Sequence, residues 1–260
     1  MRRTVQDRFY RRTVRVKRRD REFTGVVQVG HDVDKQMLAV RLSDGLLPVC
    51  ALVLERLKRL FDLAGDPAAI NAALGSLAES RPGLRVPGSF DAFETAVRAI
   101  LGQQISVAAA STLAGRLVRR WGTEFRPGSA GLTHLFPAPQ AIARMKPGDL
   151  TRLGIIGRRA ETLIALAQEI DSGRLLLEPG HRVEGTLRQL RAIPGIGDWT
   201  AQYIAMRALS WPDAFPHTDL GICKALGEKN PQTILKIAEQ WRPWRAYATL
   251  HLWAGLEKKL

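Results

Sequence analysis

A glycine-containing turn between two predicted helices has residue types suited to holding a phosphate. The segment reads Leu190-Arg-Ala-Ile-Pro-Gly-Ile-Gly-Asp-Trp-Thr-Ala201. Pro194 ends the first helix, while Gly195 and Gly197 can adopt positive φ angles and let another backbone approach closely. The second helix begins near Asp198, and its first amides have no partner inside the helix. These amides and the helix dipole predict an anion site, although glycine turns also join helices without binding a ligand.

A single carboxylate, Asp219, follows this turn in the sequence. A proline-rich loop, Trp211-Pro-Asp-Ala-Phe-Pro-His-Thr-Asp219, carries it to the start of another predicted helix. There the carboxylate meets free backbone amides and the positive end of the dipole, and both favour its ionised form. Two interpretations are open from the residues alone: Asp219 is only a helix cap, or it is a fixed negative charge used in catalysis.

The hairpin followed by a loop-borne aspartate resembles the helix-hairpin-helix superfamily of DNA base-excision glycosylases. Three more segments are similar to its DNA-3-methyladenine glycosylase II branch: Arg81-Pro-Gly-Leu-Arg-Val-Pro-Gly88, Asp91-Ala-Phe-Glu-Thr-Ala-Val-Arg-Ala-Ile-Leu-Gly-Gln-Gln-Ile-Ser106 and Trp241-Arg-Pro-Trp-Arg-Ala-Tyr-Ala-Thr-Leu-His-Leu-Trp253. The similarity extends from about residue 20 to the C-terminus. It implies an enzyme that flips alkylated purines, of the 3-methyladenine type, out of duplex DNA and hydrolyses their N-glycosidic bond.

The resemblance gives Asp219 the catalytic role. Cleavage of an N-glycosidic bond passes through a sugar that resembles an oxocarbenium ion, and a nearby anion stabilises that charge or orients water. Relatives that also cut the DNA backbone have a lysine where Trp199 stands, and tryptophan cannot form a Schiff base. We therefore expect a monofunctional glycosylase that leaves an abasic site.

Aromatic residues are expected to hold the flipped base. By resemblance the pocket residues are Trp199, Tyr203, Trp253 and Leu220, the last standing where some relatives have tyrosine. Electron-rich rings attract a cationic alkylated base by roughly 0.5–2 kcal/mol per ring face. Aromatic residues at helical spacing are also common in cores, and we expect that role for Trp121, Trp211, Trp241 and Trp244.

Contacts to the DNA strands are expected from the hairpin and from a break between two earlier helices. The hairpin residues are Gly195, Ile196, Gly197, Asp198 and Thr200. At the break, Gln103 and Gln104 occupy the position of the family's wedge, where a side chain fills the gap left by the flipped base. The alternative is that both glutamines only satisfy helix ends. By resemblance, the carbonyls of Arg191, Ile193 and Ile196 hold a structural monovalent cation.

No cofactor for catalysis is expected. The five histidines share no spacing typical of metal ligands. Some relatives hold an iron–sulfur cluster with four cysteines, whereas this chain has only Cys50 and Cys223. We expect both cysteines to be free thiols in a reducing cytosol.

The charge of the chain favours a polyanionic partner. Its formal net charge is +14 with a pI near 10.6, and residues 1–21 alone contribute +8. That basic arm is either a solvated segment or a contact to the DNA backbone. No long apolar run predicts a membrane span or a signal sequence. We expect a cytoplasmic monomer, associated with the nucleoid through duplex DNA.

Two regions with different periodicity position these residues, giving a mainly α fold with an N-terminal α+β part. Residues 1–85 are predicted to form a small antiparallel sheet with helices, with turns at 30–32 and 43–45. Its strands show alternating apolar residues: Val14, Val16, Val27, Val29, Leu38, Val40 and Leu42. A helix after Pro48 is expected to cover the sheet with Leu52, Leu54, Leu57, Leu60 and Phe61.

Residues 86–260 are predicted to form an all-α helix-hairpin-helix glycosylase domain. Its expected helices are 91–101, 105–121, 138–145, 157–171, 183–191, 198–210, 219–226, 231–240 and 243–257. The glycine pair at 154–157 lacks the proline and the following Trp-Thr-Ala, so it is interpreted as a turn.

Two other functions are weighed. One is a non-catalytic DNA-binding module, because the same hairpin only binds the DNA backbone in many proteins. The other is a glycosylase for oxidised or deaminated bases.

Overall fold

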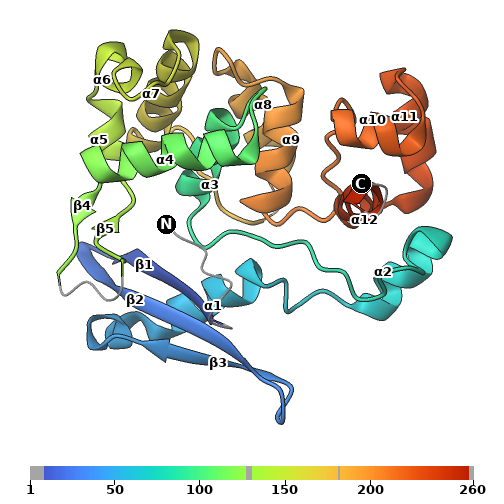
Figure 1. The fold of residues 1–260 in the computed structure, drawn as a ribbon, viewed down its shortest axis with the longest axis horizontal. Helices are drawn as coiled ribbons and strands as arrows, with labels where there is room; N and C mark the ends of the chain where they lie inside the picture. Colours follow the sequence, from blue (N-terminus) through green and yellow to red (C-terminus); the bar gives the residue numbers. More distant parts are fainter. Residues whose placement is uncertain (1–8, 127–130, 181, 258–260) are drawn as a thin grey trace.

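The structure is a computed structural model that describes residues 9–126, 131–180 and 182–257. A three-stranded antiparallel sheet is followed by a larger helical part, as the sequence predicts (Figure 1). The strands run in the order β1 (Phe9–Arg18), β2 (Arg21–Asp32) and β3 (Met37–Leu42). β2 continues through residues 30–32, where we expected a turn, so the turn lies at 33–36 instead. The first eight residues of the basic arm lie outside the described residues.

One face of the sheet is covered by a 3-10 turn (Asp44–Val49) and by α1 (Cys50–Leu60). The helix presents Val53 and Leu57 to the sheet, and both are buried together with the strand valines. Our expectation for Leu52 and Leu54 was wrong, since their exposed fractions are 41% and 38%. The reason is periodicity: residues four apart share one side of a helix, and Val53 and Leu57 continue the side begun by Val49.

The remaining helices enclose a second and larger core. They are α2 (Pro67–Leu74), α3 (Ala92–Leu101), α4 (Val107–Trp121), α5 (Pro139–Ala143), α6 (Pro147–Thr151), α7 (Gly157–Asp171), α8 (Val183–Ala192), α9 (Asp198–Arg207), α10 (Leu220–Leu226), α11 (Pro231–Ala238) and α12 (Arg245–Glu257). Every expected helix is present; α6 and a two-residue ribbon, β4 (Thr123–Glu124) with β5 (His134–Leu135), were not foreseen. Ile70 and Leu74 of α2 are buried in this core. The domain boundary near residue 85 stays a prediction.

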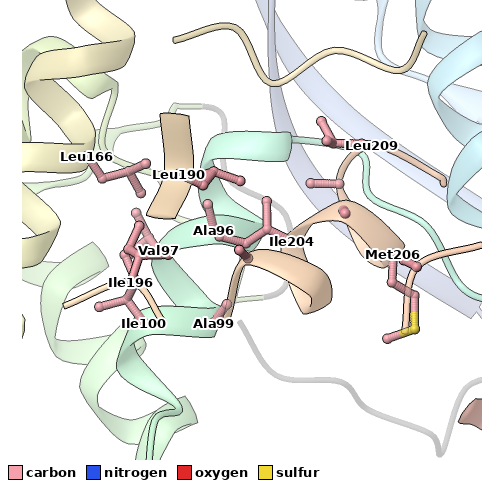
Figure 2. Close-up of a cluster of buried hydrophobic side chains, with 14 of the residues drawn as sticks. Ala96, Val97, Ala99, Ile100, Leu166, Leu190, Ile196, Ile204, Met206 and Leu209 are labelled. Carbon is pink, nitrogen blue, oxygen red and sulfur yellow. The ribbon is translucent and has the colours of Figure 1, made fainter. Parts of the chain in front are cut away.

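α3 lies at the centre of the helical part and determines where the hairpin sits. Figure 2 shows Val97 and Ile100 of α3 beside Ile196, the apolar residue of the predicted hairpin. Leu190 of α8 and Ile204 of α9 approach the same cluster. Burying an aliphatic side chain stabilises a fold by about 1.5–3 kcal/mol. The hairpin is therefore fixed to the core at its tip as well as through its two helices.

A buried ion pair joins the sheet to the helical part. Arg12 of β1 donates to Glu94 of α3 at 2.7 Å, and Arg98 donates to the second carboxylate oxygen at 2.8 Å. Burial alone would raise the pKa of Glu94, but the two guanidinium groups outweigh it and hold that pKa below its usual value. At least one arginine of the basic arm is thus structural.

No helix among the described residues is long and apolar enough to cross a membrane.

Candidate active site and DNA-binding hairpin

The hairpin between α8 and α9 depends on one glycine for its shape. Gly195 has a φ of +91°, and a Cβ on it would lie 2.0 Å from Thr162 Oγ1. Thr162 in turn donates to the carbonyl of Pro194 at 2.9 Å, so α7 holds the loop from behind. Gly197 differs from our expectation: its φ is −83°, and open space surrounds a Cβ placed there. Only Gly195 therefore requires glycine for conformational reasons.

The start of α9 presents bare backbone amides. Gly197 is the N-cap and has no side chain to cap the helix, and the first backbone bond runs from the Ala201 amide to the Gly197 carbonyl at 3.0 Å. Within the described residues, the amides of 197–200 have no protein acceptor. The amide of Ile196 is not among them, because it donates to the Ile193 carbonyl at 3.0 Å and its side chain is buried. The amides that could hold an anion are consequently those of the residues that follow Ile196.

Asp198 stands in this first turn of α9 with both of its oxygens directed to cationic or titratable partners. Arg191 of α8 donates to Oδ1 through Nε at 2.8 Å. His217 Nδ1 lies 3.4 Å from Oδ2. The side chain of Asp198 thus ties α8 to the first turn of α9 through Arg191, while its buried Oδ2 has no hydrogen-bond partner among the described residues.

The two glutamines at the α3–α4 break have different surroundings. Gln103 donates from Nε2 to the Gly195 carbonyl at 2.9 Å and to Thr200 Oγ1 at 3.0 Å. The Gln103 side chain is therefore used inside the protein and does not extend as a wedge, and the Thr200 hydroxyl accepts one of its bonds. Gln104 is exposed and has a φ of +54°. A residue other than glycine in that region is strained by about 1–3 kcal/mol, and such strain collects at functional sites.

We expect Gln103→Ala to loosen the hairpin without unfolding the protein. The change deletes two hydrogen bonds to the loop, so the free energy of unfolding should fall by about 1–3 kcal/mol and affinity for abasic-site DNA should fall severalfold. Equilibrium denaturation and fluorescence anisotropy measure the two quantities. Gln168→Ala is the matched control, because it deletes one hydrogen bond from a glutamine side chain to the Ala143 carbonyl. It should leave the affinity for abasic-site DNA unchanged. Unaltered affinity in Gln103→Ala would contradict the bracing role.

Asp219 lies at the N-cap of α10 with its carboxylate held by three donors. The Ile222 amide donates to Oδ1 at 3.0 Å, as the cap position predicts. The indole nitrogen of Trp253 donates to the same oxygen at 2.8 Å, and the indole nitrogen of Trp199 donates to Oδ2 at 2.8 Å. The carboxylate is half-buried. Oδ1 thus accepts two of these bonds and Oδ2 one, so one lone pair of Oδ2 is left for a further partner.

The expected pocket residues gather around this carboxylate. Trp199 stacks on Tyr203, with ring centroids 5.4 Å apart and an interplanar angle of 19°. Trp253 reaches Asp219 from α12, while Leu220 projects into solvent with 85% of its surface exposed. Both tryptophans contact the carboxylate through the N–H edge of the indole ring. The sequence did not predict these two hydrogen bonds. Of the tryptophans expected to pack, Trp241 is buried.

The loop that delivers Asp219 is anchored by residues that sequence reasoning missed. Asp213 accepts two hydrogen bonds from Arg245 of α12, at 2.7 and 2.8 Å, and one from Arg242 at 2.7 Å. Asp213 and Arg245 are both buried. Gln202 of α9 accepts the Phe215 amide at 3.1 Å. The available signal was a second acidic residue in a proline-rich loop, but its partner lies 32 residues away.

Comparison with known proteins identifies the family. Residues 97–240 match the family described as "HhH-GPD superfamily base excision DNA repair protein", and residues 3–91 match the "AlkA N-terminal domain". The chain belongs to the HhH-GPD superfamily. Among curated members, it is 42% identical over 250 residues to DNA-3-methyladenine glycosylase 2 of Escherichia coli, covering 96% of this chain and 86% of that protein.

Solved structures of HhH-GPD glycosylases have the same fold. A 3-methyladenine DNA-glycosylase from Archaeoglobus fulgidus superposes with a TM-score of 0.77 at 24% identity, covering 95% of this chain and 87% of that one. An 8-oxoguanine glycosylase/lyase from Clostridium acetobutylicum, in complex with double-stranded DNA, gives 0.72 at 16% identity and covers 96% and 89%. The fold is thus shared by glycosylases named for different lesions.

Proposed function

We propose that this chain is a monofunctional DNA glycosylase that hydrolyses the N-glycosidic bond of alkylated purines, of the 3-methyladenine type, in duplex DNA. The observation that carries the proposal is the Asp219 carboxylate, held between two indoles, one of which belongs to Trp199 in the first turn of α9, where the bare amides lie. The amides suit a DNA phosphate, and the carboxylate suits the sugar beside it. The 42% identity to DNA-3-methyladenine glycosylase 2 supports the same activity.

Asp219 is assigned the catalytic role. As the base departs, positive charge develops on the sugar, and the carboxylate stabilises that charge or orients a water molecule on the face opposite the leaving base. No amine occupies the position of Trp199, because the only nitrogen of its side chain is the indole N–H, which donates to the carboxylate. A Schiff base cannot form there, so the product is an intact strand with an abasic site.

The lesion class follows from the aromatic residues. A purine alkylated on a ring nitrogen is cationic and is attracted to electron-rich ring faces, while a normal base gains less. The cation also leaves as a neutral base, so no general acid is required. A glycosylase for oxidised bases is not favoured, because the sequence similarity is to the alkylpurine enzymes and the likeness to 8-oxoguanine glycosylase/lyase extends to the fold alone. A non-catalytic clamp is not favoured either, since it needs no carboxylate held in this way.

The direct test is incubation of the enzyme with dimethyl sulfate-treated duplex DNA and chromatographic identification of the released bases. We expect release of 3-methyladenine and related alkylpurines, with abasic strands that break only on alkali treatment. Duplexes containing 8-oxoguanine or uracil serve as the comparison substrates. Release of those neutral bases in place of alkylpurines would refute the lesion class, and DNA binding with no release of any base would refute the enzyme.

Gln104 is proposed as the side chain that fills the gap left by the flipped base. It is exposed at the α3–α4 break, whereas the side chain of Gln103 is bound to the hairpin. We expect both Gln104→Ala and Gln104→Gly to slow excision from paired duplex about tenfold, because flipping costs a few kcal/mol. The glycine variant should be the more stable one by about 1 kcal/mol, since glycine accepts φ of +54°. Equal excision by wild type and both variants would exclude the wedge.

A structural cation is proposed at the hairpin, on the carbonyls of Arg191, Ile193 and Ile196. The Ile193 carbonyl already accepts the Ile196 amide and retains one lone pair for such an ion. Its role would be to stiffen the turn, and no step of the reaction depends on it. The partner is double-stranded DNA containing damaged bases, and the net charge of +14 predicts binding that weakens steeply with salt. We also propose that the enzyme acts as a monomer.

A further inference from the structure

We propose that Trp199 and Trp253 are positioning residues that hold the Asp219 carboxylate through their indole N–H groups, beyond any role as walls of the base pocket. The inference rests on the proposed glycosylase function. Each indole nitrogen lies 2.8 Å from a different oxygen of the carboxylate, Trp199 at Oδ2 and Trp253 at Oδ1. With the Ile222 amide, three donors from α9, α10 and α12 define the rotation of one side chain.

The geometry restricts what the carboxylate can do. Without the indoles, the backbone amide would hold Oδ1 alone, and Oδ2 would be free to turn about the Cβ–Cγ bond. With both indoles bound, the plane of the carboxylate is fixed and one lone pair of Oδ2 faces outward. Charge-assisted hydrogen bonds are roughly twice as strong as neutral ones. The two indole hydrogen bonds therefore outweigh the conformational entropy that the Asp219 side chain loses when it is held still. A preorganised anion of this kind needs no reorientation when charge develops on the sugar.

The tryptophans are themselves held on supports that do not involve the base. Trp199 stacks face to face on Tyr203, and Tyr203 accepts Arg207 Nη1 at 3.3 Å. Trp253 stands on α12, which the buried Asp213–Arg245 pair ties to the loop carrying Asp219. Figure 1 shows α10 and α12 side by side, so carboxylate and indole approach each other from adjacent helices. One face of Trp199 is thereby covered by protein, and its N–H is unavailable for reading a base.

Gly221 leaves the space in which the carboxylate and Trp253 meet. A Cβ on this residue would lie 2.9 Å from Asp219 Oδ1 and 3.0 Å from Trp253 Cδ1, closer than side-chain carbons normally approach. Glycine is otherwise a poor choice inside a helix and costs up to about 1 kcal/mol relative to alanine. Its presence in α10 is explained by this contact. Gly221 is a site residue that the sequence motif did not reveal.

The experiment removes the indole N–H group while it keeps an aromatic ring at each of the two positions. Trp199→Phe and Trp253→Phe are compared with replacement of each tryptophan by 3-benzothienylalanine, in which sulfur takes the place of the N–H on a ring of nearly the same size. Single-turnover excision of alkylpurines and affinity for a duplex with a tetrahydrofuran abasic analogue are measured separately. We expect every variant to lose roughly tenfold in rate and to keep the affinity of wild type. Trp244→Phe, which alters a tryptophan packed on Tyr247 outside the site, should retain the wild-type rate.

Gly221→Ala tests the same contact with both indoles and the carboxylate intact. The added methyl group pushes Trp253 from Oδ1 and lowers the rate severalfold, while the helix preference of alanine offsets part of the strain, so the free energy of unfolding should fall by no more than about 2 kcal/mol. Full activity of the benzothienylalanine enzymes would overturn the proposal, because the rings would then act only as walls. Loss of rate matched by an equal loss of affinity would overturn it as well.

A spectroscopic measurement separates failure of this proposal from failure of the proposed function. The chain has six tryptophans, and their indole N–H groups give separate signals in a ¹H–¹⁵N correlation spectrum. Asp219→Asn should shift the signals of Trp199 and Trp253 and raise their exchange with solvent, and should leave the Trp244 signal in place. An enzyme that released no alkylpurine but showed these shifts would refute the function and keep the contact. An active enzyme without them would refute the positioning role.

Discussion

Asp219→Asn is expected to abolish excision of alkylpurines, lowering the single-turnover rate about a thousandfold or more. The amide carries no negative charge to oppose the charge that develops on the sugar, and removal of one well-placed electrostatic group from an active site typically costs 10²–10³ in rate. It also turns an N–H₂ donor toward one of the two indole donors, so one of the present hydrogen bonds is lost.

The fold should tolerate this substitution. Asparagine caps helices as well as aspartate does, so α10 keeps its first turn and the free energy of unfolding should change by no more than about 1 kcal/mol. Affinity for the abasic-analogue duplex should remain near that of wild type, because the hairpin is untouched. Base release is measured by chromatography, binding by anisotropy and stability by denaturation. A variant that still released alkylpurines at a rate close to wild type would show that the fixed charge is not the source of catalysis.

Gly195→Ala is expected to damage both the hairpin and the stability of the protein. The new side chain would need a φ of +91° and would place its Cβ 2.0 Å from Thr162 Oγ1. Left-handed backbone costs about 1–2 kcal/mol and overpacking a further 1–3 kcal/mol. We expect a loss of about 2–4 kcal/mol in unfolding free energy, a fall in Tm of roughly 5 to 15 °C, and loss of measurable binding to abasic-site DNA.

Gly197→Ala provides the matched control, because it changes the other glycine of the same turn. Its φ is −83° and nothing lies within 4 Å of the added Cβ. Stability should therefore stay at the wild-type value, within about 0.5 kcal/mol. If both glycine variants lost stability to the same extent, the steric account of Gly195 would be wrong. If neither did, the hairpin would have a different backbone conformation from the one described.

Local patterns were sufficient to predict most helices and strands and the hairpin turn. Pro194 and Gly195 define the turn from their own conformational limits, and the cap role of Asp219 follows from a proline-rich loop before an apolar helix. Five strand valines were found by alternation; Val14, Val16, Val27 and Val29 are buried, and Val40 is partly buried. On α1, the choice between two overlapping apolar sides was decided by Val53 rather than Leu52. That choice depends on which side the sheet occupies, which a single sequence does not contain.

The long-range partners could not be predicted. The family resemblance placed Trp199 and Trp253 in the pocket, but the direction of an indole edge depends on how α9 and α12 pack. The same holds for Gln103, whose amide reaches Thr200 across 97 residues, and for the buried pair of Asp213 with Arg245. Gly221 is informative only once its neighbours are known. Each of these contacts is made between elements that meet only in the folded chain.

The first turn of α9 has a consequence for how substrate and catalyst communicate. We expect residues 197–200 to supply the amides for the DNA strand, and Trp199, within that same turn, donates to Asp219. Any displacement of the turn by an incoming strand is therefore transmitted to the carboxylate across a single side chain. We therefore expect a strand bound out of register to leave the carboxylate misaligned and its bases to be excised slowly.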